Sequence, residues 1–264
     1  MQLFYRKYGS GPPLIILHGL YGSSDNWISI ARSLEKRFTI LLPDLRNHGQ
    51  SPHNQIHNYD SMAEDLFGLV TELRLGKFFL AGHSMGGKAA MKFAMTWPEM
   101  LDGLLIADIS PFDDKSRNKE EFNQHLQILN FILASNISEI KSRSELEAIL
   151  LPVIRSEKVR GLILKNIKRE PDNSFSWKIN ASALLENIDN IMDGIDITDT
   201  NKNGITGFPV FFLKGENSEY LPEKDYIPIR ILFPAAEFIL IRGAGHWIHS
   251  DNTEAVRNCL LRFL

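Results

Sequence analysis

Residues 78–87 read Phe78-Phe79-Leu80-Ala81-Gly82-His83-Ser84-Met85-Gly86-Gly87, an apolar run that turns through G-x-S-x-G into helix-forming sequence. A strand, a sharp turn and a helix in this order expose a serine hydroxyl at the tip of the turn. Gly82 and Gly86 suit such a crowded turn because glycine allows close backbone approach. A serine hydroxyl needs a base to become a good nucleophile. We therefore predict that Ser84 is a catalytic nucleophile and that a base lies within its reach.

Short apolar runs recur along the chain in the pattern of buried strands. Besides the run before Ser84, they cover residues 14–17, 38–42, 104–107, 209–213 and 238–241. Continuous apolar runs are typical of strands buried on both faces, and the helical spacing of apolar residues over 62–73 is typical of a crossover helix. The sequence therefore predicts an α/β fold with a doubly wound, mostly parallel sheet. The loops after residues 17, 42, 81 and 107 should meet at its carboxyl edge, where such sheets bind ligands.

The character of the sequence changes between residues 112 and 200. Charged, helix-forming residues dominate there, and helices are predicted over 117–134, 143–151, 157–169 and 180–192. We expect an all-helical insertion between two late strands, with a core of residues 1–111 and 201–264 and a cap of residues 112–200. Insertions at the carboxyl edge commonly gate such sites, which favours a lid. A separate helical interaction module is the alternative.

The composition bounds the class of protein. The chain has 264 residues, of which 44% are hydrophobic and 23% charged, and a net charge of −3. This balance indicates neither nucleic acid nor an anionic membrane as a partner. The single cysteine, Cys259, excludes an intrachain disulfide and is expected to be buried. Without a hydrophobic signal core or a membrane-spanning run, we expect a cytoplasmic protein with no membrane insertion.

The histidines, aspartates and glycines of the sequence form no recognisable metal or cofactor motif. Asp44, His48, His53 and His57 lie close together in the sequence, but their spacing matches no H-E-x-x-H or comparable motif. The turn Gly9-Ser10-Gly11 lacks the Gly-Lys-Ser/Thr that follows in a phosphate-binding loop. We therefore expect neither a metal ion nor a cofactor.

A histidine stands where the base for Ser84 is needed. The segment Gly243-Ala244-Gly245-His246-Trp247 follows the last predicted strand. Its glycine-rich turn would let the His246 imidazole reach across the carboxyl edge to Ser84, which makes this histidine the predicted base. His249 is the alternative.

Motifs spread over residues 18–247 carry a family resemblance. They are His18-Gly19-Leu20-Tyr21-Gly22-Ser23 with Asn26-Trp27, Asp44-Leu45-Arg46-Asn47-His48-Gly49-Gln50-Ser51-Pro52, Gly82-His83-Ser84-Met85-Gly86-Gly87-Lys88, Asp108-Ile109-Ser110-Pro111, Trp177-Lys178-Ile179-Asn180 and Gly243-Ala244-Gly245-His246-Trp247. With them the chain resembles the α/β-hydrolases, and more narrowly the esterase–thioesterase group that includes bacterial YbfF and mammalian ABHD11. The resemblance implies an α/β-hydrolase fold with a helical lid and a Ser-His-acid triad.

The acid of that triad has two candidates. Many relatives carry it in a turn of the form Gly-Glu-x-Asp, but here the turn reads Gly215-Glu216-Asn217-Ser218, and serine holds no negative charge. Glu219 is one residue displaced from the required place. Asp108 ends the strand that follows the helix after Ser84, and at this place YbfF-type enzymes resemble this chain. Because a third group must orient the base, we predict Asp108 as the acid and keep Glu219 as the alternative.

The remaining site residues are predicted from motif position. The oxyanion needs two backbone donors, for which we predict the N–H of Met85 and, by resemblance, that of Leu20, with Tyr21 not excluded. Tyr21, Phe112 and Trp177 are predicted to contact substrate. The aromatic residues of the insertion region would suit packing of the lid on the core equally well.

These residues predict a hydrolase that forms an acyl-enzyme on Ser84. The family resemblance implies carboxylic esters or acyl thioesters with short to medium acyl chains, acyl-CoA among them. A lyase, a C–C hydrolase or a perhydrolase on the same fold is an alternative, with Lys88 and Arg46 as candidates for a substrate-carboxylate clamp. A non-catalytic ligand receptor is a further alternative. The oligomeric state is left open by the sequence.

Overall fold

The computed structural model describes residues 1–112, 119–197 and 204–264. Seven strands form one sheet in the order β1-β3-β2-β4-β5-β8-β9, in which only β1 runs antiparallel to its neighbour. The strands are β1 (Tyr5–Tyr8), β2 (Pro13–Leu17), β3 (Thr39–Pro43), β4 (Phe78–His83), β5 (Leu101–Ala107), β8 (Val210–Gly215) and β9 (Ala236–Ile241). The predicted mostly parallel α/β sheet is confirmed. The edge strand β1 was not predicted because its sequence, Tyr-Arg-Lys-Tyr, lacks an apolar run.

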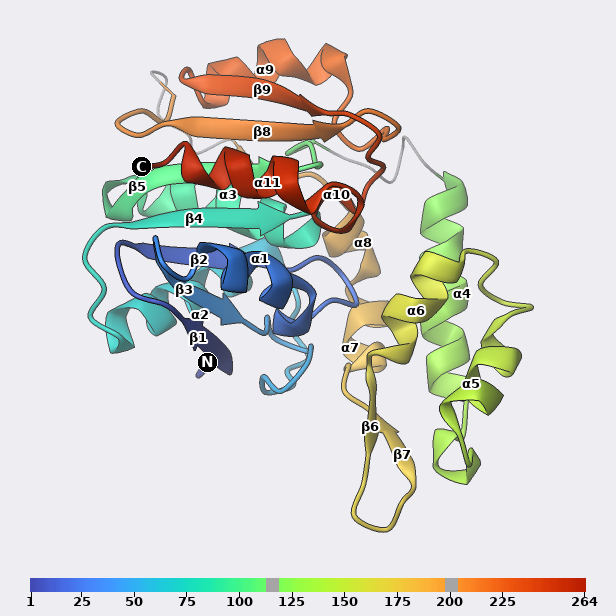
Figure 1. The fold of residues 1–264 in the computed structure, drawn as a ribbon. Helices are drawn as coiled ribbons and strands as arrows, with labels where there is room; N and C mark the ends of the chain where they lie inside the picture. Colours follow the sequence, from blue (N-terminus) through green and yellow to red (C-terminus); the bar gives the residue numbers. More distant parts are fainter. Residues whose placement is uncertain (113–118, 198–203) are drawn as a thin grey trace.

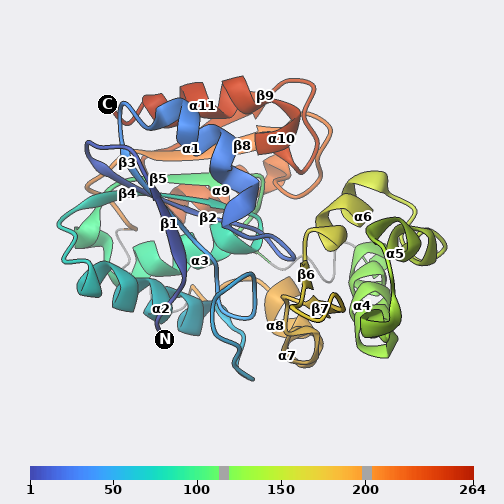
Figure 2. The ribbon, with the colours of Figure 1, turned by 60° about the horizontal axis from the view of Figure 1, so that its bottom comes forward.

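Helices cover both faces of the sheet, as Figures 1 and 2 show. One face carries α1 (Ile28–Leu34) and α11 (Thr253–Leu261), and the other carries α2 (Tyr59–Glu72) and α3 (Met85–Thr96). Side chains alternate across a strand, so Leu14 and Ile16 of β2 pack in the hydrophobic core on the side of α1 and α11. Ile15 and Leu17 pack in the core on the side of α2 and α3. The short helices α9 (Tyr226–Leu232) and α10 (Ile248–Asp251) follow β8 and β9. Cys259 is buried, as expected, in α11.

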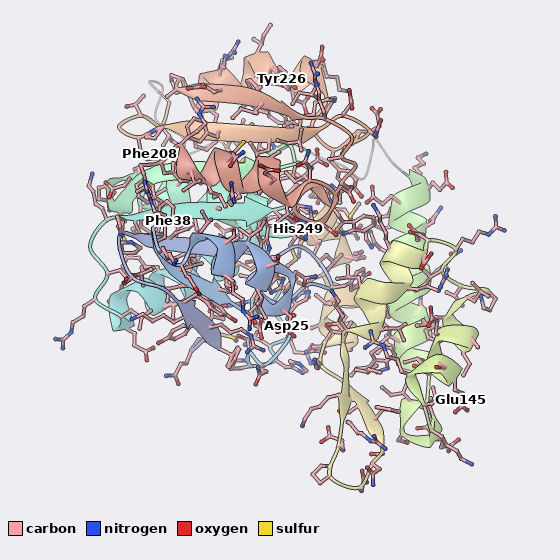
Figure 3. The ribbon with its side chains drawn as sticks, viewed as in Figure 1. Asp25, Phe38, Glu145, Phe208, Tyr226 and His249 are labelled. Atoms are coloured by element: carbon pink, nitrogen blue, oxygen red, sulfur yellow. The ribbon has the colours of Figure 1, made fainter. Side chains whose placement is uncertain are left out.

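A separate group of elements between β5 and β8 lies beyond the carboxyl ends of the strands (Figure 1). We call residues 119–192 the insertion. Its elements are α4 (Lys119–Ala134), α5 (Arg143–Leu150), α6 (Glu157–Leu164), β6 (Ile167–Arg169), β7 (Phe175–Trp177), α7 (Ala181–Glu186) and α8 (Ile188–Met192). Ser142, Ser156 and Asn180 begin three of these helices, because each side chain accepts a backbone N–H of the first turn. In Figure 3, Glu145 of α5 marks the outer side of the insertion and His249 the end of the core that faces it.

The expectation of an all-helical insertion is wrong. The predicted helix over 157–169 ends at Leu164, and β6 and β7 form an antiparallel hairpin that places Ile167 opposite Trp177. Asn173 supplies the positive φ of 69° in the intervening turn. The predicted helix over 180–192 is divided at Asn187 into α7 and α8. Segments 113–118 and 198–203, which adjoin the predicted cap boundaries, lie outside the described residues.

Hydrogen bonds from the loop after β3 and from the first residue of α2 hold the insertion against the core. Asn47, fully buried and at a φ of 67°, accepts the Asn180 N–H at 3.0 Å. The Tyr59 hydroxyl donates to the Ile191 carbonyl at 2.5 Å. These contacts hold the insertion over the carboxyl edge of the sheet. No helix in the described ranges has the length and apolar character to cross a membrane.

Candidate active site

Ser84 lies in the tight turn between β4 and α3. Its backbone has a φ of 53°, and its N–H donates to the Ala107 carbonyl of β5 at 3.1 Å. The two motif glycines explain why the chain turns here. A Cβ on Gly82 would lie 2.2 Å from the Gly86 carbonyl oxygen, and one on Gly86 would lie 2.4 Å from that of His18. Both contacts are too close for any side chain, so this turn requires glycine at both positions.

Ser84, His246 and Asp108 are joined by hydrogen bonds. His246 Nε2 lies 3.0 Å from Ser84 Oγ, and His246 Nδ1 lies 2.9 Å from Asp108 Oδ2. A carboxylate accepts only, so Nδ1 carries the proton, and the Nε2 lone pair faces the serine hydroxyl. In this arrangement the imidazole can take the proton of Ser84.

Asp108 is fully buried and its carboxylate is held from several sides. Oδ1 accepts the Gly215 N–H at 2.7 Å, and Oδ2 accepts the Ser218 hydroxyl as well as His246. Ser218 occupies the position of the turn where many relatives carry their acid, and here its hydroxyl donates to Asp108. Glu219 is exposed, and within the described ranges its carboxylate makes no hydrogen bond or ion pair. The structure thus brings Asp108, and not Glu219, to His246.

Neighbouring rings fix the position of His246. Tyr220 stacks on its ring with centroids 3.6 Å apart, and His83 donates its Nε2–H to the His246 carbonyl at 2.8 Å. Burial, reinforced by the nearby His246 and His249, holds the pKa of His83 well below its usual range, so His83 is neutral. His249 stacks on Trp27 with centroids 4.6 Å apart, and burial lowers its pKa to about 4. His246 is therefore the histidine that meets Ser84, and His249 is a buried residue stacked on Trp27 that also lines the cavity described below.

The turn from Gly19 to Gly22 lies beside Ser84, since a Cβ on Gly19 would lie 3.2 Å from Ser84 Cβ. The Gly19 carbonyl accepts from the Gly22 N–H at 2.9 Å and from His18 Nδ1 at 2.8 Å. Because a trans peptide points its N–H opposite its carbonyl, these two bonds turn the Leu20 N–H away from them. The Tyr21 N–H, the alternative candidate for the oxyanion donor, already donates to His48 Nε2 at 3.3 Å. In the described part of the chain, the Leu20 and Met85 N–H groups have no protein acceptor.

His18 and His48 hold this turn as neutral rings. Burial lowers the pKa of His18, although the nearby charge of Asp44 acts to raise it. Burial also lowers the pKa of His48, and the proximity of His18 and His57 lowers it further. The His18 Nε2 lone pair accepts the Leu45 N–H at 2.9 Å, which leaves Nδ1 to carry the proton donated to Gly19. The loops after β2 and β3 are therefore tied together through two imidazoles.

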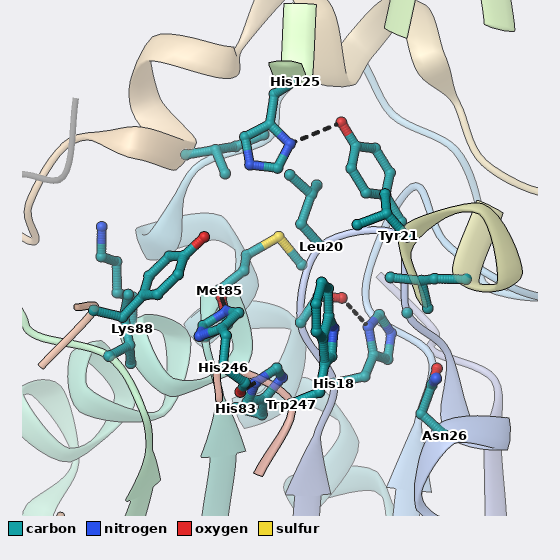
Figure 4. A pocket seen from close by; sticks show the side chains of 18 of the residues that line it. His18, Leu20, Tyr21, Asn26, His83, Met85, Lys88, His125, His246 and Trp247 are labelled. Carbon is teal, nitrogen blue, oxygen red and sulfur yellow. Dashed lines mark hydrogen bonds between the residues drawn. The ribbon is translucent and has the colours of Figure 1, made fainter. Parts of the chain in front are cut away.

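A cavity of about 120 Å³ opens onto Ser84 and His246 (Figure 4). The core contributes its floor, including Leu20, Tyr21, Met85 and Trp247. The insertion contributes Glu121, Gln124, His125, Ile128, Val159, Leu162, Ile191 and Met192. The cavity thus lies between the core and the insertion.

Two of the three predicted substrate contacts are not part of this cavity. Tyr21 lines it, but Phe112 and Trp177 do not. The Trp177 indole donates to Ser135 Oγ at 3.3 Å and belongs to the partly buried residues packed on the core cluster, as does Phe112. We therefore withdraw Phe112 and Trp177 as substrate contacts. Both side chains serve packing within the hydrophobic cluster.

The two candidates for a carboxylate clamp are already engaged. Arg46 pairs with Asp65 at 2.6 Å and donates to two backbone carbonyls, and it does not line the cavity. Lys88 does line it, but its ammonium donates to the Asp193 carbonyl at 2.9 Å and to that of Met192 at 3.4 Å. Lys88 therefore ties α3 to the end of α8.

Two polar residues of the insertion reach the site without having been predicted. His125 Nδ1 lies 3.2 Å from the Tyr21 hydroxyl, and Figure 4 shows the two facing each other across the cavity from His246. The Asn166 side chain donates to the Tyr21 carbonyl at 2.7 Å. Both contacts join segments more than 100 residues apart, so no sequence spacing could indicate them. Among the residues described, no group of three or more histidines, cysteines or acidic side chains is placed to hold a metal ion.

Known proteins share this fold and these motifs. The model of the alpha/beta hydrolase fold family matches residues 12–133. The chain is 36% identical to the sn-1-specific diacylglycerol lipase ABHD11 of Danio rerio, over 97% of this chain and 79% of that protein. It is also 32% identical to esterase YbfF of Escherichia coli, over 96% of this chain and 92% of that protein. The chain belongs to the α/β-hydrolase family.

Within that family it is a hydrolase of the YbfF/ABHD11, esterase/lipase type. A solved structure titled "Marine microorganism esterase" superposes on this hydrolase with a TM-score of 0.94 at 43% identity, covering 100% of this chain and 99% of the other. That agreement extends through both the core and the insertion.

Proposed function

We propose that this α/β-hydrolase cleaves carboxylic esters, and acyl thioesters by the same route, through a triad of Ser84, His246 and Asp108. The single observation that carries the proposal is the chain of hydrogen bonds from Ser84 Oγ through both nitrogens of His246 to a buried carboxylate. The Leu20 and Met85 N–H groups beside it support the proposal, since they remain available to an oxyanion.

In the first half-reaction the Ser84 oxygen attacks the acyl carbon while His246 Nε2 takes its proton. The carbonyl oxygen becomes an oxyanion, which accepts hydrogen bonds from Leu20 and Met85. Asp108 stabilises the imidazolium that forms and keeps the ring oriented. His246 then donates the proton to the leaving alcohol or thiol, the bond to the leaving group breaks, and an acyl-enzyme remains.

In the second half-reaction water replaces the leaving group. His246 Nε2 takes a proton from the water, whose oxygen attacks the acyl carbon, and the same two N–H groups donate hydrogen bonds to the second oxyanion. Return of the proton to Ser84 Oγ releases the carboxylic acid. Each step uses the hydrogen bonds that join Ser84, His246 and Asp108.

The cavity supports short acyl groups. Its volume of about 120 Å³ is somewhat smaller than the engineered cavity of about 150 Å³ that holds benzene. Its walls from the insertion include Ile128, Ile191 and Met192, which suit an aliphatic chain. Since the insertion forms one wall, we also propose that it acts as a lid over the site.

A graded substrate panel tests the proposed function. Wild type and Ser84→Ala are assayed against p-nitrophenyl esters from acetyl to decanoyl and against acyl-CoAs of the same lengths. We expect turnover of the short esters to be highest and Ser84→Ala to lose it by at least on the order of 10⁴-fold. Hydrolysis of no ester or thioester by wild type would contradict the proposal, and activity on esters alone would remove thioesters from it.

A further inference from the structure

We propose that Asn166 of the insertion is a positioning residue for the oxyanion hole, acting through the backbone of Tyr21. The inference rests on the proposed function, because it concerns the donor that Leu20 offers to the oxyanion. It assigns a role in the chemical step to a residue that the sequence motifs do not mark. One path of hydrogen bonds runs from the end of α6 toward the Leu20 N–H.

Tyr21 has a strained backbone conformation within the turn from Gly19 to Gly22, which we call the oxyanion turn. Its φ of 60° lies in the left-handed region, which side chains other than glycine rarely adopt without external support. Three contacts supply that support. His48 accepts the Tyr21 N–H, Asn166 donates to the Tyr21 carbonyl, and His125 meets the Tyr21 hydroxyl. Two of the three come from the insertion.

Asn166 is itself rigidly held. It is only 2% exposed, and its amide nitrogen donates to the Leu162 carbonyl at 3.1 Å as well as to Tyr21 at 2.7 Å. Its backbone carbonyl accepts the Lys178 N–H at 2.7 Å, which fixes the junction of α6 with the hairpin. Both amide hydrogens are therefore committed, and the Asn166 side chain cannot turn without breaking a buried hydrogen bond.

The contact reaches the oxyanion through two peptide planes. The Tyr21 carbonyl that Asn166 holds shares a peptide plane with the Gly22 N–H, and that N–H donates to the Gly19 carbonyl at 2.9 Å. The Gly19 carbonyl in turn shares a peptide plane with the Leu20 N–H. Because each plane is rigid, releasing the Tyr21 carbonyl frees the first plane to rotate and weakens the hold on the second. The direction of the Leu20 N–H then becomes less well defined.

The test compares Asn166→Ala with Asn130→Ala in steady-state hydrolysis of a short p-nitrophenyl ester. Asn130 is a matched control, because its side chain also donates to a carbonyl within the insertion but is exposed. For Asn166→Ala we expect kcat to fall by about 10–10²-fold, as for a misplaced reacting group, with KM changed by less than about threefold. Asn130→Ala should match wild type in both parameters.

A transition-state analogue separates positioning from general loss of structure. A trifluoromethyl ketone that adds to Ser84 forms an oxyanion, so its affinity should fall by the same factor as kcat/KM, whereas the product acid should bind as in wild type. If Asn166→Ala does not fold, as judged by its melting curve, Asn166→Leu fills a similar volume and takes its place. An unchanged kcat in a folded variant, or a raised KM alone, would overturn the inference.

Failure of the proposed function would look different. In that case wild type itself would hydrolyse no ester and bind no trifluoromethyl ketone, and the comparison of asparagine variants would have no activity to measure. A wild type that hydrolyses esters, with an Asn166→Ala variant that does so equally well, would overturn only the role of Asn166.

Discussion

The core and the insertion meet at one cavity but contribute to it in different ways. Ser84, Asp108 and His246 each follow a core strand, and backbone bonds hold the first two in the sheet, from Ser84 to Ala107 and from Asp108 to Leu213. The insertion supplies apolar wall residues and a few polar contacts to the oxyanion turn. We infer that the core carries the chemistry of the proposed reaction, whereas the insertion determines which acyl groups fit and how well the turn from Gly19 to Gly22 is held.

The largest effect is expected at the acid. Asp108→Asn should lower kcat on the order of 10⁴-fold, because an amide neither stabilises the imidazolium nor keeps its tautomer. Glu219→Gln is the matched control and should keep turnover within about twofold, since Glu219 is exposed. Steady-state kinetics on one short ester measure both. Near-normal turnover in Asp108→Asn with loss in Glu219→Gln would exchange the two roles.

The glycines of the core turn come next. Gly86→Ala places a Cβ about 2.4 Å from the His18 carbonyl oxygen and should lower the free energy of unfolding by about 1–3 kcal/mol. Activity should also be lost, because the turn that carries Ser84 has to shift. Gly68→Ala in α2 meets no atom within 4 Å and should stabilise the protein by up to about 1 kcal/mol. Urea unfolding measures both. Equal stability of the two variants would argue against a tightly packed elbow.

Substitutions in the insertion wall should change selectivity with little effect on the chemical step. Ile191→Ala enlarges the cavity beside Ser84, so kcat/KM for longer acyl esters should rise relative to acetyl by about tenfold. Leu151→Ala, at an exposed insertion site that does not line the cavity, is the control and should leave the chain-length profile as in wild type. An unchanged profile in Ile191→Ala would remove the insertion from the acyl site.

The smallest effect concerns the buried histidines of the core loops. Burial, with the charge of Arg46, lowers the pKa of His57 from 6.5 to about 3. Between these two pH values the unfolded chain binds a proton at His57 that the folded protein does not bind. His57 therefore takes nothing from the free energy of unfolding above pH 6.5, and it reduces that free energy increasingly as the pH falls toward about 3. His57→Gln should therefore lose less stability than wild type between about pH 7 and about pH 5.

Urea midpoints at these two pH values measure the difference. Glutamine keeps an oxygen that can accept the Asn47 amide, as His57 Nδ1 does at 3.2 Å, so folding should be preserved. Because His18, His48, His83 and His249 also have lowered pKa values, the variant should retain part of the pH dependence. Identical slopes in wild type and variant would show that His57 does not titrate as its burial implies.

The same division explains which features could be predicted from sequence. Core strands are continuous apolar runs, and their loops must meet at one edge, so the sheet and the proximity of Ser84, Asp108 and His246 follow from local patterns. The catalytic roles of these residues stay predictions. Asp108 could be weighed against Glu219 because Ser218 occupies the usual acid position and cannot carry the charge.

The insertion was less predictable because its elements depend on docking. The strands β6 and β7 have three residues each, too few for an alternating pattern, and the sequence there also suits a helix. Trp177 is large and apolar, which favours a pocket wall as much as packing, and the structure places it against Ser135. Asn166 carries no local signal at all, since its role depends on a contact with Tyr21 across 145 residues.

The proposed function depends on Ser84 as the nucleophile, activated by His246. Its most direct test is reaction of the intact protein with a fluorophosphonate, followed by peptide mass spectrometry. We predict a single adduct on Ser84 in wild type, no adduct in Ser84→Ala, and strongly slowed labelling in Asp108→Asn. Absence of an adduct in wild type, or an adduct that persists in Ser84→Ala, would show that Ser84 is not the nucleophile.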